Sequence, residues 1–312
     1  MIAALAGGVG GAKLADGLAR LLGDKLSVIV NTGDDFEHLG LAISPDLDTV
    51  TYTLAGIANP ETGWGVAGES WNALDQVAKL GGPGWFRLGD KDIALHLVRS
   101  QRLRRGENLT AVTADICARL GIAARILPMT DDSVHTLVDT AEGPLAFQDY
   151  FVARRCEIPV TGFRFAGIAD AKPSPAVVSV LNDRTLDAVM ICPSNPFVSV
   201  DPILGLPGLR DLLVQRTCPL LAVSPIIGGT AVKGPAAKMM RELGLDVSAT
   251  SVAGHYRGLI DGLVIDTADA GLAGTIEAMG IKTLVTPTLM KTAEDRTVLA
   301  QSCLDFAAAL RR

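Results

Sequence analysis

The sequence has few of the features that mark nucleic-acid-binding, disulfide-rich and zinc-binding proteins. Its 28 lysine and arginine residues are outnumbered by 34 aspartate and glutamate residues, which gives a net charge of −6. This balance excludes the generally basic surface that nucleic acid and anionic membranes require, although it leaves room for a local basic pocket. The five cysteines are scattered and form no CxxC pair, so we predict reduced thiols rather than disulfides or zinc ligands.

Long hydrophobic runs are also missing. The apolar start at Met1–Ala6 has no basic segment before it and is too short to cross a bilayer, so we expect neither a signal peptide nor a membrane span. The expected location is therefore cytoplasmic. Hydrophobic residues nevertheless make up 48% of the 312 residues, which is enough to bury a large core.

Short apolar segments, each followed by glycine or polar residues, recur along the chain. They lack the alternation of a half-exposed strand, as expected for parallel strands covered by helices on both faces. Their repetition predicts an α/β fold with a Rossmann-like, doubly wound and mostly parallel sheet. The segments are Ile2–Leu5, Leu26–Val30, Arg125–Leu127, Ala188–Cys192, Leu220–Val223, Gly262–Ile265 and Thr283–Val285.

The stretch from about 60 to 105 differs from the rest. It contains all three tryptophans and shows helical patterning at Trp71–Leu80 and Ile93–Arg104, so we predict a helical insertion that caps the carboxyl edge of the sheet. Gly143 and Pro144 divide Thr136–Val152 into two segments of an expected antiparallel excursion. Because we find no repeat and no linker, we interpret residues 1–312 as a single domain.

A glycine-rich segment, Gly7–Lys13, follows the first predicted strand and precedes a predicted helix. Glycine allows the backbone to approach a phosphate closely, and the helix offers its positive end, so Gly8, Gly10, Gly11 and Lys13 are candidate phosphate-binding residues. The segment is not a Walker A loop, and Lys13 replaces the third glycine of the dinucleotide fingerprint. A tight turn without a ligand is the alternative.

Acidic side chains gather after the second predicted strand, in Asn31–Asp35 and Ile43–Thr49. Mg²⁺ prefers hard oxygen ligands and bridges one or two carboxylates to substrate phosphates, so Asp34 and Asp35 are candidate magnesium ligands. Aspartates also cap helices and turns, which is the alternative for each of them taken singly.

Polar motifs stand at further predicted strand ends and loops. Ser194 and Asn195 lie between two prolines, and Ser224–Gly229 follows the next strand, so both loops could read a base or a phosphate. Arg87–Asp92 could hold a phosphate or the oxygens of a flat ligand, with a solvated turn as the alternative. Lys233–Lys238 opens a helix that could face an anion or could be an ordinary proline start.

Taken together, these motifs resemble the 2-phospho-lactate transferase family of coenzyme F420 biosynthesis, the CofD/FbiA type. The resemblance runs from residue 1 to at least 260, and the order and spacing of the motifs agree throughout. Further matches to the bacterial branch are Trp64-Gly65, Glu69–Asn72, His96–Arg99 and Phe147-Gln148. The motifs that carry the resemblance are Gly7–Lys13, Asn31–Asp35, Ser44–Thr49, Leu88–Asp92, Pro193–Pro196 and Ser224–Gly228.

The resemblance implies an Mg²⁺-dependent transfer of a phospholactyl or phosphoenolpyruvyl group from a diphosphoguanosine donor (LPPG or EPPG) to the ribityl hydroxyl of the deazaflavin Fo, which releases GMP. It implies that Asp48 lies at the ribityl chain, as a catalytic residue or metal ligand, with Asp46 as the second catalytic candidate. Arg87, where relatives often carry lysine, and Trp64 would also contact Fo. The implied nucleotide site comprises the first glycine loop, Asn31, Ser194, Asn195, Ser224 and Gly228.

Relatives also imply a homodimer. The bacterial motifs favour an enolpyruvyl donor, but the residues do not distinguish it from a lactyl or glyceryl donor. A second hypothesis is a YvcK-like regulatory protein that binds nucleotide-sugars, although its second motif differs from Asp34–His38. A third hypothesis is a nicotinamide oxidoreductase, but Lys13 in place of the third glycine of the dinucleotide fingerprint argues against it.

Overall fold

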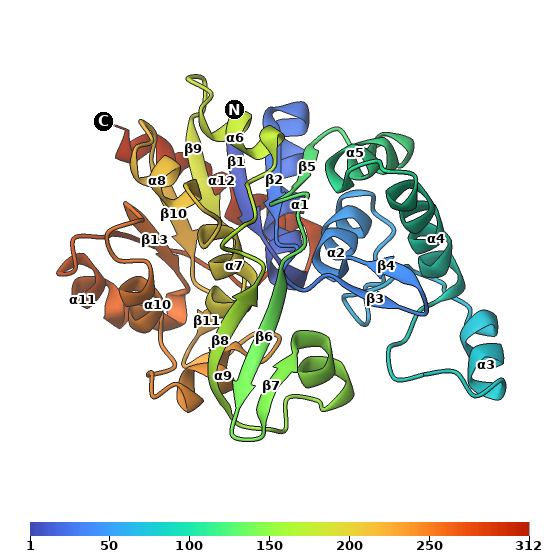
Figure 1. Cartoon of the computed structure of the whole chain (residues 1–312). Coiled ribbons are helices and arrows are strands. Elements are labelled where there is room, and N and C mark those ends of the chain that lie inside the picture. The colour runs from blue at the N-terminus through green and yellow to red at the C-terminus, as the bar shows by residue number, and fades with distance from the viewer. Residues whose placement is uncertain (312) are drawn as a thin grey trace.

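The computed structural model describes residues 1–311, and a seven-stranded parallel sheet forms its centre (Figure 1). The strands lie in the order β14-β13-β10-β9-β1-β2-β5. The predicted strands are all present, and the α/β doubly wound prediction is confirmed. Their bounds are β1 (Ile2–Ala6), β2 (Leu26–Val30), β5 (Arg125–Pro128), β9 (Ala188–Ile191), β10 (Leu220–Val223), β13 (Gly262–Ile265) and β14 (Lys282–Val285).

Both faces of this sheet are buried, which explains why its strands lack polar alternation. Successive side chains of a strand point to opposite faces. In β1, Ala3 and Leu5 pack into one hydrophobic core, whereas Ile2 and Ala4 pack into the other. One core is covered by α1 (Gly8–Leu22), α2 (Pro45–Leu54), α5 (Leu109–Arg119) and α12 (Ala293–Leu310); the other by α6 (Pro175–Leu181), α7 (Asp201–Leu204), α8 (Leu209–Val214), α9 (Ala236–Glu242), α10 (Ala249–His255) and α11 (Ala273–Glu277).

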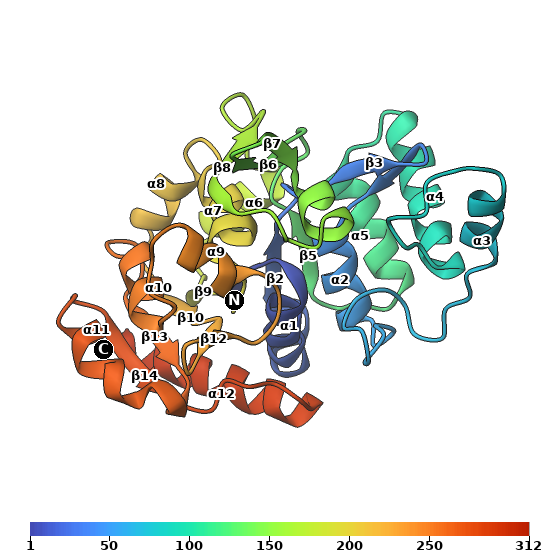
Figure 2. The same cartoon turned by 90° about the horizontal axis from the view of Figure 1, so that it is seen from below.

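The segment around 60–105 contains two helices, α3 (Asn72–Lys79) and α4 (Asp90–Arg104). α4 packs against α5 and against the hairpin strand β4 (Leu41–Ile43), which pairs with β3 (Phe36–His38). Figure 2 shows α3 at the periphery, on the far side of α4 from the sheet. The loops of this segment, rather than α3, therefore reach the carboxyl edge of the sheet.

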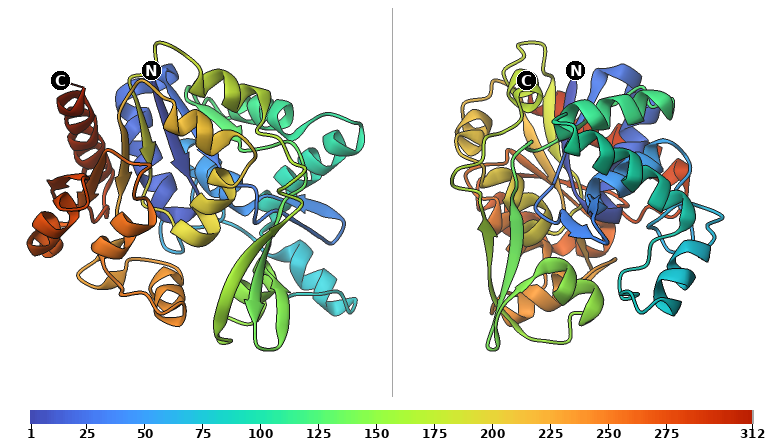
Figure 3. Two further views of the ribbon diagram at one scale, coloured as in Figure 1. Left: turned by 60° about the vertical axis from the view of Figure 1, so that its left-hand side comes forward. Right: turned by 45° about the vertical axis from the view of Figure 1, so that its right-hand side comes forward.

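An antiparallel sheet of β6 (His135–Thr140), β7 (Gly143–Ala146) and β8 (Val160–Ala166) projects beyond the carboxyl edge (Figure 3). The expected excursion is present at β6 and β7, but the third strand, β8, was not predicted. A small hairpin joins β11 (Ile226–Ile227) to β12 (Thr230–Ala231). The remaining short helices are η1 (Gly23–Lys25), η2 (Asp149–Ala153), η3 (Pro196–Val200) and η4 (Thr267–Leu272).

No helix within residues 1–311 combines the length and the apolar character needed to cross a membrane.

Helices α1 and α12 cross at close range, although they lie at opposite ends of the chain. Arg296 of α12 forms an ion pair with Asp16 of α1 at 3.0 Å. A Cβ atom built on Gly17 would lie 2.1 Å from the carbonyl oxygen of Arg296, which is far inside van der Waals contact. The crossing therefore requires glycine at position 17.

We expect Gly17→Ala to lower the free energy of unfolding by about 1–3 kcal/mol, because the added methyl group forces the two helices apart. Alanine otherwise favours a helix over glycine by about 1 kcal/mol. Gly274→Ala in α11, where an added Cβ meets nothing within 4 Å, is the matched control and should be neutral or stabilising. Urea denaturation measures both, and a Gly17→Ala protein as stable as the wild type would contradict the close crossing.

Candidate active site

A pocket of about 610 Å³ opens at the carboxyl edge of the sheet. Gly7 and Asp34 line it from the loops after β1 and β2, and Pro193 and Ser224 line it from the loops after β9 and β10. The chain order reverses between β1 and β9, and ligands bind open α/β sheets at such a switch point. This pocket is therefore the candidate active site.

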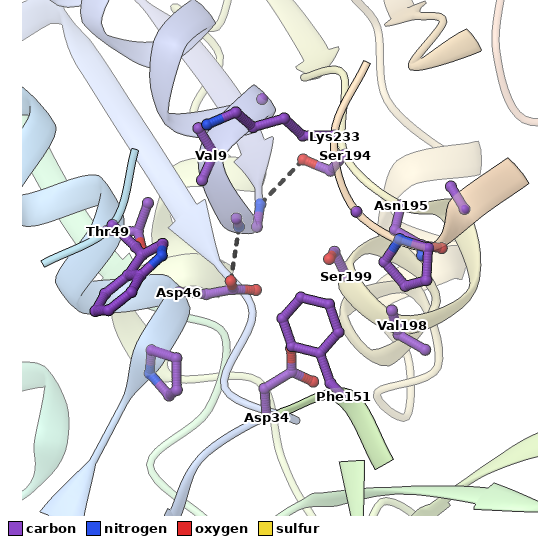
Figure 4. Close-up of a pocket in the computed structure, with 18 of the residues that line it drawn as sticks. Val9, Asp34, Asp46, Thr49, Phe151, Ser194, Asn195, Val198, Ser199 and Lys233 are labelled. Atoms are coloured by element: carbon purple, nitrogen blue, oxygen red, sulfur yellow. Dashed lines mark hydrogen bonds between the residues drawn. The ribbon is translucent and has the colours of Figure 1, made fainter. Parts of the chain in front are cut away.

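The glycine turn between β1 and α1 forms the floor of the pocket. Gly8 has φ +65°, which is a left-handed conformation that glycine adopts without strain. A Cβ atom on Gly10 would lie 2.3 Å from the carbonyl oxygen of Pro193, so only glycine lets the loops after β1 and β9 meet here. The main-chain N–H of Gly7 donates to Ser194 Oγ at 3.1 Å, and that of Gly8 donates to Asp46 Oδ1 at 2.7 Å (Figure 4).

Asp46, in the first turn of α2, connects this turn to the loop after β2. Its second carboxylate oxygen accepts a hydrogen bond from Asn31 Nδ2 at 3.0 Å. Asn31 is fully buried and also donates to the carbonyl oxygen of Val198 at 3.2 Å. Burial raises the pKa of Asp46 to about 6, although the hydrogen bonds from Asn31 and Gly8 lower it. Asn31 thus positions Asp46 from beneath the pocket.

Asp34 is buried and Asp35 is half-buried near Asp46, and neither forms an ion pair within residues 1–311. Burial, followed by the charge of Asp46, raises the pKa of Asp34 well above its usual value. Burial likewise raises the pKa of Asp35, whose Oδ2 accepts from Ser44 Oγ at 2.7 Å. One carboxylate oxygen of each, Oδ1, has no hydrogen-bond partner among residues 1–311. Figure 4 shows the Asp34 and Asp46 carboxylates facing the same cavity.

Asp48, also in the first turn of α2, has its charge compensated by Arg99 of α4. Arg99 Nη1 donates to Asp48 Oδ2 at 3.1 Å, and Nη2 donates to Oδ1, so both oxygens are engaged by one guanidinium. Both side chains are buried. His96 Nδ1 lies 3.7 Å from Asp48 Oδ2, and its Nε2 lies 3.4 Å from Asp92 Oδ1. The sequence motifs included Arg99 and His96 but did not predict their contact with Asp48.

The wall near Asp48 is largely aromatic. Trp64, which is 45% exposed, and Arg87 line it from the helical insertion. The Arg87 guanidinium lies over the ring of Trp71, 4.2 Å from its centroid, which is a cation–π contact. Such a wall suits a flat, apolar ring system. Four further aromatic residues of this wall were not predicted as site residues from the sequence: Trp85, Phe86, Phe147 and Phe151.

The opposite wall is formed by the loops after β9, β10 and β14. Ser194 and Ser224 line it, and Asn195 caps η3 by accepting the N–H of Phe197 at 3.0 Å. Two lysines complete this wall. Lys13 Nζ donates to the carbonyl oxygen of Met290 at 2.8 Å, and Lys233 Nζ donates to that of Thr62 at 3.1 Å.

The residues predicted from sequence fall into two groups by position. The pocket is lined by Gly8, Gly10, Lys13, Asp34, Asp46, Asp48, Trp64, Arg87, Ser194, Asn195 and Ser224. Four predicted residues lie outside the lining: Gly11, Asn31, Asp35 and Gly228. Gly11 packs against Ser194 and Ala6, Asn31 and Asp35 are directed at neighbouring side chains, and the N–H of Gly228 donates to Asp269.

Residues 1–311 contain no group of three or more histidine, cysteine, aspartate or glutamate side chains placed to hold a metal ion by themselves. The buried Oδ1 atom of Asp34, which accepts no hydrogen bond from residues 1–311, nevertheless fits a cation that takes most of its ligands from water and substrate, as Mg²⁺ does. The donor set is thus compatible with Mg²⁺ bound jointly by protein and substrate.

Comparison with known proteins agrees with this geometry. The family model described as 2-phospho-L-lactate transferase CofD matches residues 2–285. A phosphoenolpyruvate transferase of Thermobifida fusca is 42% identical, over 99% of this chain and 98% of its own. One of Streptomyces griseus is 40% identical over 99% of both chains. A 2-phospho-L-lactate transferase of Methanosarcina mazei is 38% identical over 95% of this chain and 96% of its own.

A solved structure of a upf0052-family protein from Bacillus halodurans shares the fold, with a TM-score of 0.60 over 97% of this chain and 98% of its own, at 14% identity. That likeness concerns the fold alone. The family match and the close relatives confirm the resemblance drawn from the motifs and favour a transferase over a regulatory protein or an oxidoreductase. The chain belongs to the CofD family and is a transferase.

Proposed function

We propose that this protein transfers a phosphoenolpyruvyl or phospholactyl group from a diphosphoguanosine donor to the ribityl hydroxyl of the deazaflavin Fo, in the biosynthesis of coenzyme F420. The hydroxyl oxygen attacks the phosphorus distal to guanosine, the bond from that phosphorus to the bridging oxygen breaks, and GMP leaves with the bridging oxygen. The names of the relatives, phosphoenolpyruvate transferase and 2-phospho-L-lactate transferase, support the transferred groups.

The observation that carries the proposal is the division of the pocket into two unlike halves. One half, the phosphate half, is formed by the glycine turn and Lys13 and suits a nucleotide phosphate. The other half, the aromatic half, is formed by the aromatic wall that contains Trp64 and suits a flat ring. Asp46 and Asp48, both in the first turn of α2, line the same pocket. A reaction that joins a phosphate-bearing donor to an aromatic acceptor needs this arrangement, because phosphoryl transfer depends mainly on positioning and charge.

Two carboxylates have distinct parts in this proposal. Asp46, with its pKa raised to about 6, is suited to take up the proton of the attacking hydroxyl near neutral pH. Asp48 is held rigidly by the two-point contact with Arg99, so it is suited to orient the ribityl chain through a hydrogen bond. Arg87 and Trp64 would contact the deazaflavin ring from the aromatic wall.

We further propose that the reaction requires Mg²⁺, with Asp34 as the protein ligand that faces the pocket. When bound, the ion would neutralise charge on the transferred phosphate. Asp35 lies behind the lining, and both oxygens of Asp48 are engaged by Arg99, so each is less suited to bind the ion than Asp34 is.

Incubating the protein with Fo, Mg²⁺ and the enolpyruvyl, lactyl or glyceryl donor tests the proposal directly. We expect GMP and an acidic deazaflavin, detected by chromatography and mass spectrometry, with the enolpyruvyl donor reacting fastest. Chelating the metal with EDTA should stop the reaction, and added Mg²⁺ should restore it. If no donor gives a product, the proposed transfer is wrong.

Asp48→Asn should lower kcat by at least about 100-fold, because the ribityl hydroxyl loses its orientation. This variant also leaves Arg99 without its counter-charge, so Asp48→Glu is the companion: it keeps the charge and displaces the carboxylate. We expect both to lose turnover and Asp48→Glu to keep the wild-type melting temperature. Asp75→Asn, on the exposed face of α3, is the control and should retain full activity. Wild-type turnover in Asp48→Asn would remove Asp48 from the mechanism.

The pKa of Asp46 predicts the pH dependence. Because the ionised carboxylate accepts the proton, kcat/KM should rise between pH 5 and pH 7, with an apparent pKa near the value of about 6 of this group. Asn31→Ala removes a hydrogen bond that lowers this pKa, so the rise should move to higher pH by about one unit. Asn182→Ala, at the end of α6, should leave the profile unchanged. A shift to lower pH in Asn31→Ala would contradict the role of Asp46.

A further inference from the structure

Lys233 lines the pocket, and although the Lys233–Lys238 motif predicts a possible anion site at a helix start, it assigns no role to the Lys233 side chain. It lies in the loop between β12 and α9 and reaches over the glycine turn, beside Val9 (Figure 4). A Cβ atom built on Gly63 would lie 2.7 Å from Lys233 Nζ and 3.2 Å from Val9 Cγ1, so the ammonium is close to the start of α1.

The ammonium groups of Lys13 and Lys233 have no carboxylate partner within the part of the chain described. Each donates only to a main-chain carbonyl oxygen, that of Met290 or that of Thr62. By contrast, Lys238 of α9 pairs with Glu242 at 2.5 Å, and Arg20 of α1 pairs with Asp16 at 3.0 Å. Lys13 and Lys233 therefore both bring positive charge without an ion-pair partner, within residues 1–311, to the lining of the pocket.

These two lysines also repel one another. Burial, then the charges of Arg296 and Lys233, lower the pKa of Lys13. Asp295 raises that pKa, but its carboxylate already accepts the N–H groups that cap α12. Two like charges near the positive end of a helix repel one another. A ligand with two or more negative charges that binds between them would replace this repulsion with attraction.

We propose that Lys13 and Lys233 form a clamp for a diphosphate, in which one ammonium binds each phosphate. Lys233 thereby becomes a donor-binding residue supplied from a loop 220 positions away from Lys13. The clamp rests on the proposed function, because that function identifies the ligand as the diphosphate of the donor nucleotide. Lys233 also contacts Thr62, in the loop that carries Trp64, so the bound donor lies next to the acceptor half of the pocket.

Calorimetric titration of the full chain with GDP and with inorganic pyrophosphate, without Fo, tests the clamp. We expect both ligands to bind, and Lys233→Met to weaken both by between about 10- and 100-fold, as for loss of a hydrogen bond to a charged group. Lys233→Arg should keep most of the affinity. Lys282→Met removes an exposed lysine at the amino end of β14, at the opposite edge of the sheet, and should bind as the wild type does.

Lys233→Gln separates the charge from the contact with Thr62, because it keeps an N–H donor and loses the charge. We expect Lys233→Gln to weaken the binding of both ligands as much as Lys233→Met does. The clamp is overturned if Lys233→Gln or Lys233→Met binds both ligands as tightly as the wild type, or if the wild type binds neither. Since binding is measured without an acceptor, a protein that binds diphosphate through Lys233 but forms no product would overturn the proposed transfer and leave the clamp standing.

Discussion

The whole pocket depends on the buried carboxylate of Asp46. One of its oxygens accepts the N–H of Gly8 in the turn after β1, and the other accepts the side chain of Asn31 after β2. A single acid at the start of α2 therefore fixes three segments that are distant in sequence. The loops of an α/β sheet are otherwise free to vary in position, so this contact sets the distance between the phosphate half and the aromatic half of the pocket.

Charge compensation then gives each acid of the pocket a different chemistry. Asp48 is matched by Arg99 and is fixed in place, whereas Asp34 and Asp46 share a buried volume without a cation. Uncompensated buried carboxylates are unfavourable for the empty protein, because burial penalises their charged forms. The protein tolerates this cost at the place where we propose that Mg²⁺ binds and a proton is taken up, and such perturbed groups are common at functional sites.

The central sheet could be predicted from sequence because parallel strands buried on both faces leave continuous apolar segments, as at Leu26–Val30. Most of the pocket-lining residues also follow from their position at strand ends. The direction of a side chain could not be predicted: Asn31 stands at a strand end but points beneath the pocket. The contact of Asp48 with Arg99 joins residues 51 positions apart, and β8 pairs with β6 across the intervening β7 and η2, so local patterns reveal neither.

The crossing of α1 and α12 bears on how the molecule is made. α1 begins at the glycine turn, yet Asp16 on this helix is held by Arg296, 280 residues later. During synthesis, the glycine turn and α1 therefore leave the ribosome first. The contact of α1 with Arg296 can form only after nearly all of the chain has been made. Contacts of such long range form slowly, because a large loop must close before they contribute. The side of α1 that packs against α12 thus stays uncovered for most of the synthesis, until α12 completes the core.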